Sequence, residues 1–153
     1  MGWMEDPAKL PGKTGREKIK FLFSFLLTDQ EKLELDILGG GNTDVVAKNP
    51  RMIWMMLESS VRQAAPVLTA LIELGNADGS LHVAQPKETS EACMILMNMW
   101  VGVFVGGKAD FMAKIHLLKS FCDALNLPIV DGDILTICGN YYDKVVSNFQ
   151  PLP

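Results

Sequence analysis

A run of thirteen residues in the middle of the chain limits its fold more than any other feature. Residues 93–105 read CMILMNMWVGVFV, in which Asn98 is the one polar side chain and Gly102 the one glycine. The run is shorter than the roughly 18 to 20 apolar residues that a helix needs to cross a bilayer. It is also too uniformly apolar for a surface helix with a single buried face. We therefore expect a central helix that is buried on several sides.

Length and composition favour a single globular domain. The chain has 153 residues, 48% of them hydrophobic and 21% charged, which is enough to bury an ordinary core. Three cysteines, Cys93, Cys122 and Cys138, form no CxxC pair, and an odd number leaves at least one unpaired. This pattern predicts a reduced, cytoplasmic protein. The net charge of −4 argues against DNA binding by this chain alone.

Helix signals recur along the chain, whereas strand signals are nearly absent. Prolines and glycines in residues 1–15 predict a flexible lead-in, followed by one domain over residues 16–150. A first helix is expected from Arg16, and three consecutive glycines at 39–41 predict a mobile loop.

Two Xaa-Pro pairs mark later helix starts. Asn49-Pro50 combines a good N-cap with a residue that suits the first helical position, and Gln85-Pro86 repeats the proline signal. The helix from Pro50 should run for about 25 to 30 residues and kink or split at Pro66. Further helices are expected over 109–125 and from Asp131 or Asp133 to about 147. The prediction is an all-α fold of five to six helices.

No motif in the chain supports catalysis or metal binding. GKTG at 12–15 contains the Gly-Lys-Thr of a phosphate loop, but Pro7 stands where that loop needs its first glycine. His82 and His116 belong to no pattern with metal-ligand spacing. We therefore expect no enzyme activity, no metal and no cofactor.

Large, soft side chains concentrate on two of the expected helices, which is typical of adaptable ligand pockets as well as of plain cores. Asn98 could orient a ligand in such a pocket. Glu58 and Arg62 could favour a cationic or an anionic group, or could simply pair with each other at i,i+4. The predicted ligand-binding residues are Trp54, Met55, Glu58, Arg62, Met94, Met97, Asn98, Val101 and Phe104.

The last two helices carry apolar stripes that are wide enough to face a core and a partner at once. Pairing these helices across a two-fold axis would form a four-helix bundle in a homodimer. The predicted dimer-interface residues are Phe111, Ile115, Leu118, Phe121, Cys122, Ile134, Cys138, Tyr141 and Val145.

The order of these features resembles the C-terminal regulatory domain of tetracycline-repressor-like (TetR/AcrR) transcription factors. The resemblance is most motif-like over residues 70–101, and residues 16–27, REKIKFLFSFLL, resemble the connecting helix of the family. The matching residues are Glu73, Gly75, Gly79, Leu81, His82, Pro86, Lys87 and Glu88.

The resemblance implies an effector-binding and dimerisation domain. In the family a small molecule, here a hydrophobic or amphipathic one, moves the connecting helix and lowers the affinity of paired helix-turn-helix heads for the DNA operator. Such a head should precede the connecting helix, so the lead-in is expected to be the remnant of a linker to a missing head. The alternative is a headless helical dimer that acts as a protein-interaction module. A small helical enzyme acting on a lipophilic substrate is a third and weaker hypothesis.

Overall fold

The computed structural model describes residues 5–28 and 48–148, and every regular element within them is helical. This result confirms the all-α prediction, while the loop expected at 39–41 lies outside the described residues. The long helices are α2 (Gly15–Thr28), α5 (Pro50–Ser59), α6 (Ala65–Asp78), α7 (Pro86–Ile95), α8 (Lys108–Ala124) and α9 (Gly132–Lys144). Short 3-10 turns cover Pro7–Lys9 and Val146–Asn148.

Helices α5 and α6 form one continuous rod that is joined by a π-helical segment, Ser60–Ala64. The side chain of Asn49 caps the rod by accepting hydrogen bonds from two first-turn amides. Pro66 has no N–H to donate, and just before it the Ala65 N–H donates to the Ser60 carbonyl, five residues back. The expected disturbance at Pro66 therefore takes the form of a wider turn, and the helix does not break.

Helix α7 also continues into a π-helical segment, Leu96–Val101. Helical residues continue to Val103, and residues 104–107 are irregular. Val103 and Val105 are buried, whereas Phe104 between them is 59% exposed. The Lys114 ammonium donates to the Phe104 carbonyl and so anchors this turn to α8.

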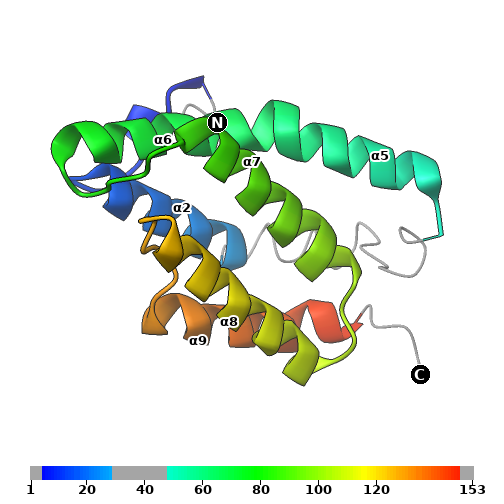
Figure 1. The fold of residues 1–153 in the computed structure, drawn as a ribbon. Coiled ribbons are helices and arrows are strands. Elements are labelled where there is room, and N and C mark those ends of the chain that lie inside the picture. The colour runs from blue at the N-terminus through cyan, green and yellow to red at the C-terminus, as the bar shows by residue number, and fades with distance from the viewer. Residues whose placement is uncertain (1–4, 29–47, 149–153) are drawn as a thin grey trace.

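Three tiers of helices are visible in Figure 1. The α5–α6 rod lies along one side, α8 and α9 lie on the opposite side, and α2 and α7 lie between them. Helix α2 packs against both α6 and α9, and α7 packs against α6. Buried residues form one cluster around Ile19, Leu68 and Leu71 and a second around Phe111 and Ile134. None of the described helices is long and apolar enough to span a membrane.

The N-terminus of α2 docks closely on the end of α6. Gly15 faces Gly75 so closely that a Cβ on Gly15 would lie 2.2 Å from the Gly75 nitrogen. The Gly15 N–H donates to Asp78 Oδ2 at 2.8 Å, and the Glu17 N–H donates to Thr14 Oγ1 at 3.2 Å. Hydrogen bonds from Ser80 and from Gly15 lower the pKa of Asp78. Its negative charge is therefore retained beside the N-terminus of α2, which is the positive end of that helix dipole.

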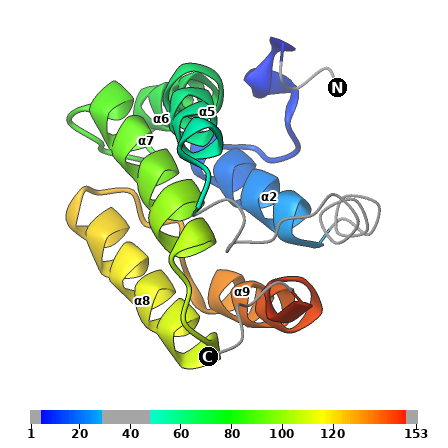
Figure 2. The same ribbon diagram turned by 90° about the vertical axis from the view of Figure 1, so that its right-hand side faces the viewer.

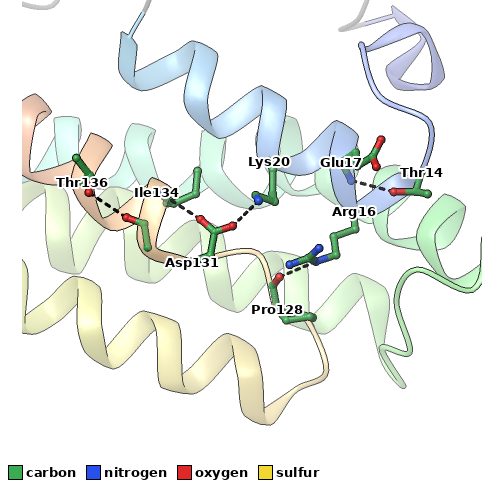
Figure 3. Close-up of polar contacts among 9 residues, drawn as sticks. Thr14, Arg16, Glu17, Lys20, Pro128, Asp131, Ile134 and Thr136 are labelled. Atoms are coloured by element: carbon green, nitrogen blue, oxygen red, sulfur yellow. Dashed lines mark hydrogen bonds and ion pairs between the residues drawn. The ribbon is translucent and has the colours of Figure 1, made fainter.

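Polar contacts also tie α2 to the turn before α9 (Figure 3). Arg16 Nε donates to the Pro128 carbonyl at 2.9 Å, and Lys20 forms an ion pair with Asp131. Asp131 also accepts from the Ile134 N–H at 3.0 Å, which caps α9. Lys20, followed by that amide, lowers the pKa of Asp131. One carboxylate therefore connects α2 to the start of α9.

Candidate ligand cavity

A cavity of about 910 Å³ lies among α2, α5, α7, α8 and α9. These helices are arranged in a ring when viewed as in Figure 2. Both buried clusters contribute walls, and Met97 packs against both of them. The volume falls within the range of roughly 300 to 1,000 Å³ that is typical of small-molecule sites.

The described walls of the cavity are mostly apolar and carry no charged side chain. Methionines come from three elements, and polar atoms come from Ser59, Ser60, Asn98 and the Tyr141 side chain. Met52 and Met55 line the cavity and are also exposed to solvent, so the cavity opens to solvent along α5. Such a site favours an uncharged, apolar or amphipathic molecule, because it offers no ion to pair with a charged one.

One hydrogen bond in the cavity wall joins the two π-helical segments. Asn98 Nδ2 donates to Ser60 Oγ at 3.0 Å, and Ser60 Oγ donates to the Met56 carbonyl at 2.8 Å. Ser60 is buried and Asn98 is exposed, so the pair lies at the edge of the site. An amide group has two N–H donors, and Ser60 accepts from one of them. The Asn98 side chain is therefore held in a fixed direction beside the cavity.

The structure brings together five of the nine residues predicted to bind ligand. The residues that line the cavity are Met55, Met94, Met97, Asn98 and Val101.

Three of the other predicted residues lie on the outer face of the α5–α6 rod. The lining row follows Met52, Met56 and Ser59, whereas Trp54 is two positions from Met52 and so projects from the far side. Trp54 is 59% exposed. Glu58 and Arg62 continue its row and pair with each other at 3.1 Å on the surface. The expectation that these three side chains face the cavity was wrong.

The expectation for Phe104 was also wrong, because the helical residues end at Val103, one position before Phe104. In the segment that follows, neighbouring side chains alternate between inside and outside, and Phe104 falls on the outside.

The stripes predicted to form a dimer interface face the interior of the chain. All of these residues except Phe121 line the cavity: Phe111, Ile115, Leu118, Cys122, Ile134, Cys138, Tyr141 and Val145. Phe121 is half-buried and packs against the first cluster. Seven of the nine residues are buried within their own chain, so the structure does not present them to a second copy, whereas Phe121 and Tyr141 are half-buried.

Helix α2 and Ser60 also line the cavity, and neither belongs to the predicted ligand-binding residues. Phe23, Leu26 and Leu27 contribute the α2 wall. Ser60 continues the i,i+4 row of Met52 and Met56, and this spacing is the signal that could have identified it.

Two thiols in the cavity wall lie close together. The Sγ atoms of Cys93 on α7 and Cys122 on α8 are 3.8 Å apart, and both side chains are buried. The hydrogen bond between the two sulfur atoms lowers the pKa of Cys93, while the same bond, followed by burial, raises the pKa of Cys122. Cys138 lines the cavity as well, and burial raises its pKa to about 11.

No group of three or more His, Cys, Asp or Glu side chains in the described part of the chain could hold a metal ion. Comparisons of the chain with protein-family models, with curated proteins and with solved structures found no match.

Proposed function

We propose that the chain is the effector-binding and dimerisation domain of a tetracycline-repressor-like transcription regulator. In this proposal the cavity binds an uncharged hydrophobic or amphipathic small molecule. DNA is bound by a helix-turn-helix head outside this chain, and no nucleic acid is bound by the chain itself. The resemblance over residues 70–101 and the cavity support the same function.

The observation that carries the proposal is the contact between the cavity and α2. Phe23, Leu26 and Leu27 form one wall of the cavity, and α2 corresponds by resemblance to the connecting helix. A ligand that needs more room than the cavity offers would displace this wall. The ligand shifts the equilibrium between two α2 positions only as far as it binds one of them better than the other.

Binding is tested with two dyes that share an aromatic skeleton and differ in charge. N-phenyl-1-naphthylamine is uncharged, whereas 1-anilinonaphthalene-8-sulfonate is an anion. The uncharged dye should fluoresce with the protein and raise its melting temperature. At a dye concentration of a hundred times Kd, the free energy of unfolding should rise by about 2.7 kcal/mol. The anion should bind more weakly, because the described walls offer it no cation. Equal binding of both dyes, or no saturable binding of either, would contradict the proposed chemistry.

A cavity-filling variant locates the dye. Val101→Trp and Met97→Trp add bulk in the cavity and should abolish binding with little loss of stability. Leu71→Trp is the control, since Leu71 is fully buried and does not line the cavity. Overpacking there should cost about 1 to 3 kcal/mol or more. If Val101→Trp and Met97→Trp lower the melting temperature as much as Leu71→Trp does, the cavity is absent in solution.

A second candidate is a protein-interaction module without ligand. The observation that favours it is the exposed face of α8, where Leu117 is 57% exposed among the small side chains of Ala113, Ser120 and Ala124. The same face is the surface through which we propose that the domain forms a homodimer. Saturable binding of the uncharged dye at Val101 distinguishes the regulator from the module.

A further inference from the structure

Two thiols face each other where α7 passes α8. The Sγ atoms of Cys93 and Cys122 lie 3.8 Å apart, and their side chains are 1% and 4% exposed. Because sulfur atoms in a disulfide are about 2.05 Å apart, a relative movement of roughly 1.8 Å would join them. The chain has one further cysteine, Cys138, which is also buried and lines the same cavity.

Cys93 is the better nucleophile of the pair. Cys122 lies in the last turn of α8 and precedes Asp123, so the helix dipole and a neighbouring charge both disfavour a thiolate there. No neighbouring charge raises the pKa of Cys93, and the hydrogen bond between the two sulfur atoms lowers it. The thiolate, and not the thiol, is the reactive form of cysteine.

The cavity controls what can reach this pair. Both thiols are buried but line the cavity, so a reagent from solvent passes through its mostly apolar interior. A small, strongly hydrated oxidant enters such a space at a cost, whereas an apolar organic one does not. A bound metal ion is disfavoured, because no third ligand joins the two thiols in the part of the chain that the structure describes.

We infer that Cys93 and Cys122 form a redox-active dithiol that apolar organic hydroperoxides oxidise to a disulfide inside the cavity. This inference goes beyond the proposed function, because it describes a covalent modification that requires neither DNA nor reversible ligand binding.

The reaction proceeds in two steps. The Cys93 thiolate attacks the terminal oxygen of the hydroperoxide, the O–O bond breaks, and the alkoxide takes up the proton released by Cys93 to leave as an alcohol. Cys93 is thereby oxidised to a sulfenic acid. The Cys122 sulfur then attacks the Cys93 sulfur, the S–O bond breaks, and the hydroxide leaves as water with the Cys122 proton. The hydroperoxide is reduced by two electrons, and two thiols become one disulfide.

The first step also activates the second. The hydrogen bond to Cys93 and the charge on Cys93 are two of the causes that raise the pKa of Cys122. A sulfenic acid is neutral, so its formation removes the repulsion and frees the Cys122 sulfur to attack.

The test uses the full, reduced chain and cumene hydroperoxide. After treatment, remaining thiols are alkylated in denaturant and the protein is mapped by mass spectrometry. Cys93 and Cys122 should be lost together as one cross-linked peptide pair, while Cys138 remains alkylated. The ratio of the rate with cumene hydroperoxide to the rate with hydrogen peroxide should exceed that of free glutathione by about tenfold.

Variants separate the two roles. Cys122→Ser should stop at a Cys93 sulfenic acid that dimedone traps, and Cys138→Ser should still yield the cross-linked Cys93–Cys122 peptide pair. Circular dichroism checks that each variant is folded. If a variant does not fold, the peptide mapping of the parent chain still tests the inference.

Three results would overturn the inference. The first is a parent chain that keeps three alkylatable thiols under conditions that oxidise glutathione. The second is oxidation of Cys138 as fast as that of Cys93. The third is a rate ratio equal to that of glutathione, which would show that the cavity does not select the oxidant. Dye binding without oxidation would leave the proposed function standing, and oxidation without dye binding would leave this inference standing.

Discussion

At the scale of single residues, the contact between Gly15 and Gly75 sets how closely α2 approaches α6. A methyl group at position 15 would lie 2.2 Å from backbone nitrogen, and backbone cannot move aside as a flexible side chain can. Gly15→Ala should therefore lower the free energy of unfolding by about 1 to 3 kcal/mol. Urea denaturation measures the loss.

The control for this substitution is Gly132→Ala at the start of α9. A Cβ there would meet nothing within 4 Å, and its φ is not positive. Its effect should stay within about 1 kcal/mol, in either direction. Equal losses for the two variants would mean that the α2–α6 contact is looser than the structure shows.

The hydrogen bond between Asn98 and Ser60 predicts energetic coupling between the two π-helical segments. Ser60→Ala and Asn98→Ala each remove one partner of this hydrogen bond. Once one substitution has broken the bond, the other should cost less stability than it does in the parent chain. The double-mutant cycle should therefore give a coupling of about 0.5 to 1.5 kcal/mol. Thermal or urea unfolding of the four proteins measures it. Strictly additive effects would show that the two side chains do not interact in solution.

At the scale of elements, one carboxylate holds α2 to the end of α6 and another holds it to the start of α9. The pKa values of Asp78 and Asp131 are lowered in the folded chain, so the unfolded state binds protons more tightly there. Their contribution to stability is complete above the ordinary aspartate pKa of about 3.9 and is lost as the pH falls through the lowered values.

Acid should consequently weaken the fold through these two residues. The urea midpoint of the parent chain should drop as the pH falls below about 4, and Asp78→Asn or Asp131→Asn should flatten that dependence. A slope that is identical in the parent chain and in both variants would contradict the prediction.

Helix starts could be predicted because they depend on local chemistry. Pro50 and Pro86 begin helices as expected, and α2 begins one residue before Arg16. Asp131 rather than Asp133 caps α9. The Thr14–Glu17 cap of α2 was overlooked, although GKTGRE contains the spacing of such a cap.

The assignment of helix faces is where the sequence was insufficient. Leu117 and Leu118 are adjacent and chemically identical, yet one is 57% exposed and the other is buried. Each belongs to an apolar row at helical spacing, and the spacing alone cannot say which row faces inward. Packing against α9 and the π-helical segment Leu96–Val101 decides the question, and the sequence spacing within α8 carries no information about those contacts.

At the scale of the whole molecule, the cavity explains why residues predicted for the dimer interface lie inside the chain, while some residues predicted to bind ligand lie outside. Residues that were assigned to a partner surface, such as Ile115 and Cys138, form cavity walls, whereas Trp54 and Phe104 lie on the surface. A wide apolar face is needed to surround an internal space as much as to bind a second copy. The mostly apolar walls also leave the recognition of ligand to shape, which favours several related molecules over one.

Self-association is the last prediction and belongs to this scale. The outer face of α8 presents Leu117 between Ala113 and Ser120, and small neighbours allow two helices to approach closely. If this face pairs two copies, Leu117→Glu should yield a folded monomer, because it places like charges opposite each other without touching the core. Leu118→Glu should instead unfold or precipitate the chain, since it buries an unpaired charge. Sedimentation velocity at micromolar concentration reports the mass, and circular dichroism reports the fold. A parent chain that sediments as a monomer would rule out the dimer, and a Leu117→Glu protein that remains dimeric would move the interface to another face.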